Sequence, residues 1–128
     1  MIIGNFTKGI ELKYKNHYFS GICCNSTKCK KDYIFFAIKG TKIDGNKFIN
    51  HAIQKGAKII ISNQKFEGIK KGILFIKSSN VRKSLSEFAY TIYKDKPKNI
   101  IAVTGTNGKS SIADFYFQIL KMNKKKVA

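Results

Sequence analysis

Residues 104–110, which read TGTNGKS, combine the residue types that bind the phosphate groups of a nucleoside triphosphate. Gly105 and Gly108 let backbone N–H groups approach a phosphate, because no Cβ stands in the way. The Lys109 ammonium can reach the β- and γ-phosphates, and the Ser110 hydroxyl is placed to ligate Mg²⁺. The segment therefore predicts a site for ATP and Mg²⁺ in which Lys109 has a catalytic role.

This loop departs from the strict pattern G-x-x-x-x-G-K-[ST], because Val103 stands where the first glycine would be. An ordinary glycine turn before a helix is the alternative interpretation. The Gly-Lys-Ser start of the following helix favours the nucleotide site. The predicted nucleotide-binding residues are Gly105, Thr106, Asn107, Gly108, Lys109, Ser110 and Ser111.

The chain on either side of the loop shows the patterns of a strand and a helix. Residues 99–103 form an apolar run typical of a strand. After the loop, apolar residues recur at the spacing of one helix face: Ile112, Phe115, Tyr116, Ile119 and Leu120. One strand and one helix cannot close a nucleotide-binding domain. We therefore expect residues 98–128 to be the truncated start of an ATP-binding domain.

Residues 33–61 predict a strand-helix-strand unit. Residues 33–38 and 57–61 are unbroken apolar runs, as in strands buried on both faces. Between them, residues 47–55 have helical spacing, and Gly56 stands where a left-handed cap belongs. The two strands should be parallel, with a right-handed crossover.

Three further segments complete the expected N-terminal domain. Residues 10–14 alternate apolar and polar side chains, so they could pair as a hairpin with residues 18–24. Residues 73–76 form a third apolar run, which we expect in the same sheet.

A second helix should begin after Ser79 or Asn80 and end near Tyr93. The charged segment 94–98 contains the only proline and is typical of a linker. We therefore place a domain boundary at residues 97 and 98.

The formal net charge of +18 raises nucleic acid as a possible partner, because lysines that neutralise phosphates drive non-specific binding. Arg82 is nevertheless the only arginine, whereas proteins that read phosphates and bases favour arginine. We interpret the lysines as a solvated surface that favours anionic ligands, and predict no nucleic-acid partner.

No apolar run reaches the length of about 18 residues that a membrane-spanning helix needs, and residues 1–9 do not have the pattern of a secretory signal. We therefore predict a cytoplasmic protein without membrane insertion. Cys23, Cys24 and Cys29 match neither a zinc-ligand pair nor a redox Cys-x-x-Cys, so we expect reduced thiols.

Residues 104–111 resemble the TGTNGK-[ST]-[ST] loop of the Mur ligases, the ATP-dependent amide ligases of peptidoglycan synthesis. Folylpolyglutamate synthases have a similar loop. The N-terminal region favours the Mur ligases, because residues 32–40, DYIFFAIKG, followed by Asp44 and Gly45, resemble elements of their N-terminal domains. The resemblance covers essentially the whole chain.

This resemblance implies an α/β fold: a small mixed-sheet domain, residues 1–97, that recognises UDP-MurNAc-peptide, and then the first strand, P-loop and helix of a truncated P-loop ATPase domain, residues 98–128. Within the family, the resemblance implies the ligases that add the third peptide residue to UDP-MurNAc-L-Ala-D-Glu through an acyl phosphate intermediate. The expected amino acid is meso-diaminopimelate. We expect a monomer. The residues that match UDP-contacting segments are Cys24, Ser26, Thr41, Lys42 and Ile43.

Two departures from the family accompany the resemblance. Asn25 and Thr27 stand where the family has aspartate and arginine, which removes a charge pair beside the expected UDP site. The family's later Mg²⁺ ligands, carbamylated lysine and C-terminal domain have no counterpart in residues 1–128. A catalytically inactive fragment or a nucleotide-binding module is therefore the alternative function.

Overall fold

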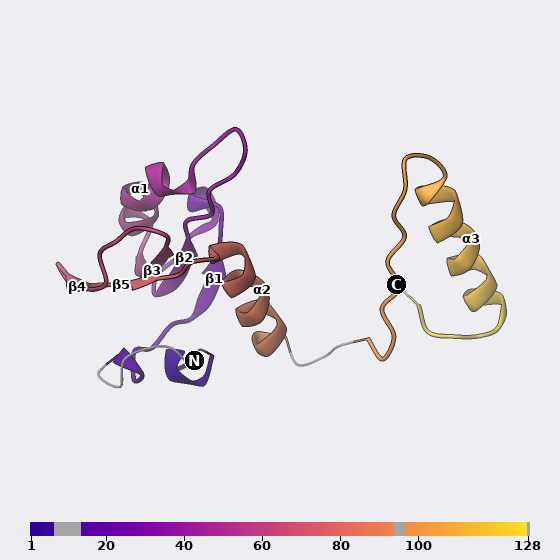
Figure 1. Ribbon diagram of the computed structural model, residues 1–128. Coiled ribbons are helices and arrows are strands. Elements are labelled where there is room, and N and C mark those ends of the chain that lie inside the picture. The colour runs from indigo at the N-terminus through magenta and orange to yellow at the C-terminus, as the bar shows by residue number, and fades with distance from the viewer. Residues whose placement is uncertain (7–13, 94–96, 128) are drawn as a thin grey trace. The chain divides into compact units, whose positions relative to one another are not determined.

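The computed structural model describes residues 1–6, 14–93 and 97–127 (Figure 1). The chain divides into two compact units, residues 1–94 and residues 95–128. The first unit contains a sheet with helices, and the second contains the loop of residues 104–110 and one helix.

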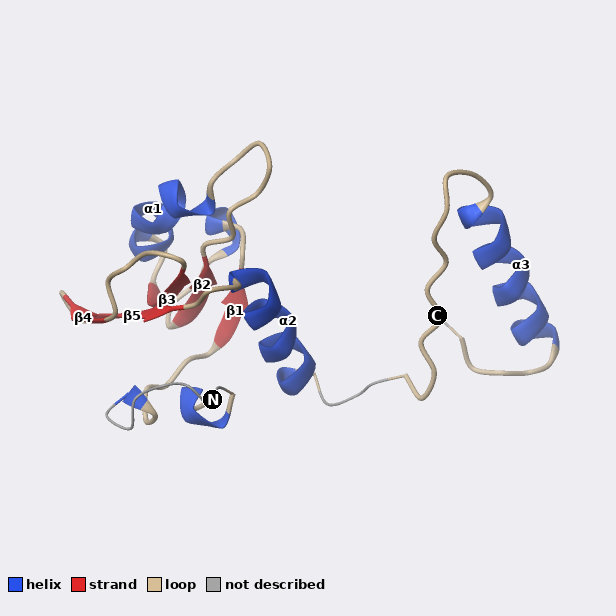
Figure 2. Ribbon diagram, viewed as in Figure 1, coloured by secondary structure: helices blue, strands red, loops and turns tan. Residues whose placement is uncertain are grey.

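The first unit is built on a five-stranded mixed sheet (Figure 2). Its strands, in spatial order, are β1 (Gly21–Cys23), β2 (Tyr33–Phe36), β3 (Ala57–Ser62), β5 (Ile73–Lys77) and β4 (Gly68–Lys70). The first four are parallel, and β4 pairs antiparallel with β5 at the edge. The predicted α/β class with a small mixed sheet is confirmed.

The predicted strand-helix-strand unit is also confirmed. A short 3-10 turn, η4 (Gly45–Phe48), leads into helix α1 (Ile49–Gln54) between β2 and β3. Gly56 ends this crossover with φ +105, a conformation that L side chains rarely adopt. A Cβ there would also lie 2.8 Å from the Lys31 Cα, so both strain and crowding require glycine.

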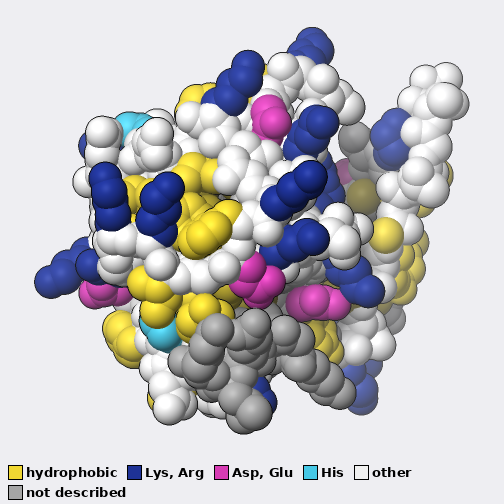
Figure 3. All heavy atoms as spheres, turned by 60° about the vertical axis from the view of Figure 1, so that its left-hand side comes forward, with side chains coloured by type: hydrophobic (Ala, Val, Ile, Leu, Met, Phe, Trp, Pro, Cys, Tyr) yellow, Lys and Arg dark blue, Asp and Glu magenta, His cyan; other side chains and the backbone are white. Residues whose placement is uncertain are grey.

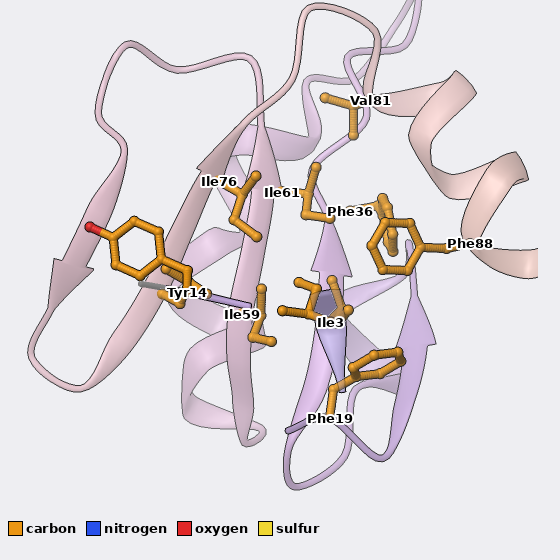
Figure 4. Close-up of a cluster of buried hydrophobic side chains, with 11 residues drawn as sticks. Ile3, Tyr14, Phe19, Phe36, Ile59, Ile61, Ile76, Val81 and Phe88 are labelled. Carbon is orange, nitrogen blue, oxygen red and sulfur yellow. The ribbon is translucent and has the colours of Figure 1, made fainter. Parts of the chain in front are cut away.

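Alternate residues of the strands point to opposite faces of the sheet, which gives the unit two cores. On one face, helix α2 (Val81–Ile92) packs against Phe36, Ile59 and Ile61. Phe88 is fully buried there, with its ring 5.4 Å from that of Phe36 (Figure 4). This face holds most of the large buried aromatic side chains.

The other face is covered by α1. Ile49 and Ala52 of this helix are buried together with Phe35 and Ile60 of the two central strands. The sheet therefore lies between two helices, and its central strands are buried on both faces, as their unbroken apolar runs predicted.

Asn80 caps α2, since its side-chain oxygen accepts a hydrogen bond from the Lys83 N–H at 3.0 Å. The predicted cap and helix are thus confirmed.

The predicted hairpin of residues 10–14 and 18–24 stays a prediction, because residues 10–13 lie outside the described residues. Tyr14, the remaining residue of the first segment, is in no strand. β1 pairs in parallel with β2, and Tyr18 forms only an isolated bridge with Ile2.

The second unit contains helix α3 (Lys109–Met122), as predicted. Residues 99–103 form no strand in the described part of the chain, which differs from the prediction. A strand needs hydrogen bonds to a neighbouring strand, and the described residues of this unit contain no strand with which residues 99–103 could pair.

Candidate functional site

Two loops of the first unit follow neighbouring strands at the same edge of the sheet. Residues 24–28 follow β1, and residues 37–44 follow β2. Because β1 and β2 are parallel and adjacent, their carboxyl ends lie side by side. In open α/β sheets this edge is where ligands bind. All five predicted UDP-contacting residues lie in these two loops.

The first loop is held by its own side chains. Asn25 accepts hydrogen bonds from the Thr27 N–H at 3.0 Å and from the Thr27 hydroxyl at 2.8 Å. These two residues occupy the positions where the family has aspartate and arginine, and they replace the charge pair with a neutral hydrogen-bonded pair. Neither side chain of this pair carries a charge.

Ser26 is buried, and its hydroxyl lies 2.9 Å from His51 Nδ1 on α1. The bond links the loop to the helix across 25 positions in the sequence. The side chains of Cys24, Asn25, Thr27 and Lys28 are exposed, so a ligand at this loop can reach them. Ser26 thus positions the loop, and its backbone stands between these exposed residues.

A disulfide between Cys23 and Cys29 closes the same loop, with a Cα–Cα distance of 6.0 Å. The expectation of three reduced thiols is therefore wrong for this pair, whereas Cys24 is free and exposed. Sequence spacing gave no signal, because pairing depends on β1 and the following 3-10 turn bringing the two Cβ atoms together. The bond further restricts the loop that carries Cys24 and Ser26.

The second loop presents four exposed side chains, those of Lys39, Thr41, Lys42 and Ile43. Gly40 N–H donates to the Ile43 carbonyl at 2.9 Å, which folds these residues into a tight turn. Asp44 ends the turn, and its carboxylate accepts from the Asn46 N–H at 2.9 Å. This backbone hydrogen bond and the Asn46 side chain hold the pKa of Asp44 below its ordinary value of 3.8. The Lys42 side chain is thus exposed to solvent on a turn that is held by hydrogen bonds.

In the second unit, the loop of residues 104–108 has the geometry that its glycines predicted. Gly105 has φ +148 and Gly108 has φ +74, both outside the range usual for L side chains. The Lys109 ammonium donates to the carbonyl oxygens of Gly105 and, at 3.0 Å, of Thr106. The cation is therefore held over the loop that the glycines shape.

Helix α3 starts directly after this loop, with Gly108 as its N-terminal cap. The first hydrogen bond of the helix runs from the Ile112 N–H to the Gly108 carbonyl. The N–H groups of Lys109, Ser110 and Ser111 precede it and have no acceptor within the helix. These donors, the helix dipole, the lysine and the exposed Ser110 hydroxyl fit a magnesium-bound triphosphate.

The sequence did not predict that His51 holds the first loop in place through its hydrogen bond with Ser26. Its partner Ser26 is distant in the sequence, so only the packing of α1 against the first loop reveals the pair. Within the described residues, no group of three or more His, Cys, Asp or Glu side chains could hold a metal ion. No helix in that same part of the chain is long and apolar enough to cross a membrane.

Comparison with known proteins now defines the class of this chain. The catalytic-domain profile of the Mur ligase family matches residues 18–105, which include the sheet and the two loops of the first unit. The chain belongs to the Mur ligase family.

Similar proteins of this family carry specific names. UDP-N-acetylmuramoyl-L-alanyl-D-glutamate–2,6-diaminopimelate ligase of Rickettsia prowazekii is 43% identical over 115 residues, which are 90% of this chain and 24% of the relative. The ligase of the same name from Clostridium tetani is 50% identical over 87 residues, 64% of this chain and 18% of the relative. The chain thus spans about a quarter or less of the length of these relatives.

Solved structures support the fold. MurF ligase from Thermotoga maritima in complex with ADP has a TM-score of 0.60 and 25% identity, over 78% of this chain and 23% of that protein. A MurF from Acinetobacter baumannii has the same TM-score at 23% identity, over 80% of this chain and 22% of that protein.

Proposed function

We propose that this chain provides the UDP-sugar-recognition domain and the phosphate loop of an ATP-dependent Mur ligase. The type of ligase that we propose is MurE, the UDP-N-acetylmuramoyl-L-alanyl-D-glutamate–2,6-diaminopimelate ligase. The reaction would add the third peptide residue, meso-diaminopimelate, to UDP-MurNAc-L-Ala-D-Glu through an acyl phosphate on the substrate. The names of the Rickettsia and Clostridium relatives support this substrate class. We further propose a cytoplasmic monomer, with residues 1–97 as the first domain and 98–128 as the start of the second.

The observation that carries the nucleotide part is the geometry of the phosphate loop. Gly105 and Gly108 have positive φ, and three N–H groups at the start of α3 lack acceptors in the helix. The related MurF ligase from Thermotoga maritima was solved with ADP. These features support ATP binding by residues 105–111.

In this proposal each residue of the loop has a separate role. The backbone N–H groups of Lys109 and Ser110 bind phosphate oxygens, and the Lys109 ammonium moves from the loop carbonyls to the phosphates. The Ser110 hydroxyl would hold Mg²⁺. The bound metal would neutralise charge on the phosphoryl group that is transferred.

The two loops after β1 and β2 would bind the UDP part of the substrate. Cys24 and the turn of residues 41–43 lie in loops that follow neighbouring strands at one edge of the sheet, and Lys42 can face the diphosphate. The Ser26–His51 hydrogen bond fixes the first loop before a ligand arrives. Such pre-organisation lowers the entropy cost of binding.

The phosphate loop can be tested by measuring ADP and ATP affinity of the full chain by calorimetry in the presence of Mg²⁺. We expect Lys109→Ala to weaken binding by about tenfold or more, because a charge-assisted contact is lost. Lys121→Ala, at the far end of the same helix, removes the same charge and should leave the affinity unchanged. Equal weakening by both variants would show that the affinity depends on the overall positive charge and not on a contact made by Lys109.

The complete reaction needs a separate measurement. The chain spans 24% of the length of the Rickettsia relative, so we expect it alone to release no phosphate from ATP in the presence of UDP-MurNAc-L-Ala-D-Glu and diaminopimelate. Clear substrate-dependent phosphate release would contradict this expectation. The inactive-fragment alternative is favoured if the chain binds neither ATP nor the UDP-sugar.

A further inference from the structure

A cavity of about 510 Å³ lies beside α1 in the first unit. The residues that line it come from η4, α1, the segment after β3, the end of β4, the β4–β5 turn and β5: Asn46, Ile49, Asn50, Ile53, Gln64, Lys70, Lys71, Ile73 and Phe75. Cavities of this size are typical of sites for small molecules. The five residues that we assign to UDP, all of them described, are absent from this lining.

The cavity also differs from the proposed UDP site in its place on the sheet. The UDP loops follow β1 and β2, whereas the cavity uses β5 and the β4–β5 turn. Strand β3 separates these two pairs in the order of the sheet. A ligand in the cavity would therefore contact a different edge of the domain.

The floor of the cavity is apolar. Ile49 and Ile73 are buried, and Ile53 and Phe75 are partly buried members of the same cluster. The Phe66 ring lies edge-on to the Phe75 ring, with centroids 5.6 Å apart, and is itself 48% exposed. Figure 3 brings this side of the molecule forward and shows hydrophobic side chains gathered between lysines. The floor thus offers aromatic and aliphatic surface to a ligand.

The rim of the cavity is polar and positively charged. Lys70 and Lys71 line the cavity and are both exposed, as are Asn50 and Gln64. No carboxylate side chain is among the described residues that line the cavity. The nearest carboxylate with a printed contact to the lining is that of Asp44, which accepts hydrogen bonds from Asn46. Apolar surface beside two exposed lysines is complementary to a molecule with an apolar body and an anionic group.

The turn that presents these lysines is unusual in one respect. Lys71 has φ +51 and Gly72 has φ +73, so both central residues of the β4–β5 turn are left-handed. Glycine, asparagine or aspartate is favoured at such positions of a two-residue hairpin. The backbone conformation of the turn does not favour lysine at position 71, but the Lys71 ammonium adds a second cation to the rim.

We propose that this cavity is a binding site for a small organic anion. Its apolar, preferably planar, body packs on Ile53, Ile73 and Phe75, and its phosphate or carboxylate contacts Lys70 and Lys71. The concave shape and size favour a small molecule over a protein segment. The site is independent of the proposed ligase activity, since it shares no residue with the phosphate loop or the UDP loops.

The test uses the full chain and three probes in an NMR titration of backbone amides. The probes are 1-naphthyl phosphate, which has both a planar body and a charge, 1-naphthol, which lacks the charge, and inorganic phosphate, which lacks the body. We expect 1-naphthyl phosphate to bind at least about tenfold more tightly than either of the others. Its shifts should centre on the amides of α1, β5 and the β4–β5 turn.

Two variants and a control make the result specific. Lys70→Gln with Lys71→Asn removes both cations, and asparagine suits the left-handed turn, so affinity should fall about tenfold without loss of fold. Asn50→Trp adds a large side chain at the exposed wall and should block the cavity. Lys30→Gln with Lys31→Gln removes two adjacent lysines elsewhere and should leave affinity unchanged.

Several outcomes would overturn the proposal. They are equal affinity for 1-naphthyl phosphate and 1-naphthol, equal weakening in the two double-lysine variants, unchanged binding by Asn50→Trp, or shifts centred on the phosphate loop or the UDP loops.

Discussion

Helices α2 and α3 show the same kind of apolar periodicity but differ in burial. In α2, Val81 and Phe88 are buried against the sheet. In α3, all of which the structure describes, no residue is buried, and Phe115 is 63% exposed. Periodicity therefore predicts a helix, but it does not predict whether the apolar face is covered in a given chain. Burial depends on the elements available to pack against that face.

The two candidate sites differ in the same way. The UDP loops belong to a sheet with two cores and are tied down by a disulfide and by the Ser26–His51 hydrogen bond. The phosphate loop is shaped by its own glycines and by the Lys109 contacts to loop carbonyls. A local motif can form its geometry within a few residues, whereas a loop site on a sheet needs the whole domain.

The comparison predicts unequal effects of removing one phenylalanine from each helix. Phe88→Ala removes a fully buried ring that stacks on or meets the rings of Phe6, Phe19 and Phe36, so we expect a loss of about 3–5 kcal/mol of unfolding free energy. Phe115→Ala removes an exposed ring and should change stability by less than about 0.5 kcal/mol. Urea unfolding of both variants provides the measurement, and similar losses would contradict the difference in burial.

A smaller effect is expected from opening the disulfide. Cys23→Ala with Cys29→Ala frees a loop with a sequence separation of 6, which should cost about 2 kcal/mol through the entropy of the unfolded chain. Cys24→Ala changes an exposed, unpaired thiol in the same loop and is the control. Thiol counting and urea unfolding under non-reducing conditions test this, and a double variant as stable as the control would refute it.

The cap of α2 should contribute less again. Asn80→Ala removes the acceptor of the Lys83 N–H, and we expect a loss of about 1 kcal/mol. Asn80→Ser retains a capping oxygen and should recover most of that stability. Thermal unfolding of the two variants distinguishes capping from a general effect of the position, since equal losses would exclude the cap as the cause.

The smallest effect concerns pH. Since the folded-state pKa of Asp44 is lowered below 3.8, its carboxylate stabilises the fold fully above the unfolded pKa, and this contribution disappears as the pH falls through the folded pKa. Asp44→Asn should therefore reduce the loss of stability between neutral and strongly acidic pH. Carboxyl-carbon NMR titration provides the pKa directly, and a value at or above 3.8 would contradict the hydrogen-bond explanation.

Local patterns in the sequence predicted much of this fold. The apolar runs at residues 33–38 and 57–61, with Gly56 between helix and strand, predicted β2, α1 and β3 because each signal lies within a few residues. Strand β4 was not predicted, since its three residues begin at Gly68 in a polar segment and depend on pairing with β5.

The candidate sites were predictable in part. The phosphate loop is a continuous motif, and its glycines have the positive φ that the motif implied. The Ser26–His51 bond and the Cys23–Cys29 disulfide were not predicted, because they depend on how a loop, a strand and a helix pack. The cavity beside α1 likewise combines residues from three stretches of the chain, residues 46–53, 64 and 70–75.

The most direct measurement of the proposed function is an amide NMR titration of the full chain with UDP-MurNAc-L-Ala-D-Glu and, separately, with ADP and Mg²⁺. We expect the UDP-sugar to shift the amides of residues 24–28 and 39–44, and ADP to shift those of residues 104–111. Added alone, the UDP-sugar should not shift the amides of residues 104–111. ADP added alone should not shift the amides of residues 24–28 and 39–44. Failure of the UDP-sugar to shift the loops after β1 and β2, or shifts of the phosphate loop alone with both ligands, would contradict the assignment of two separate sites.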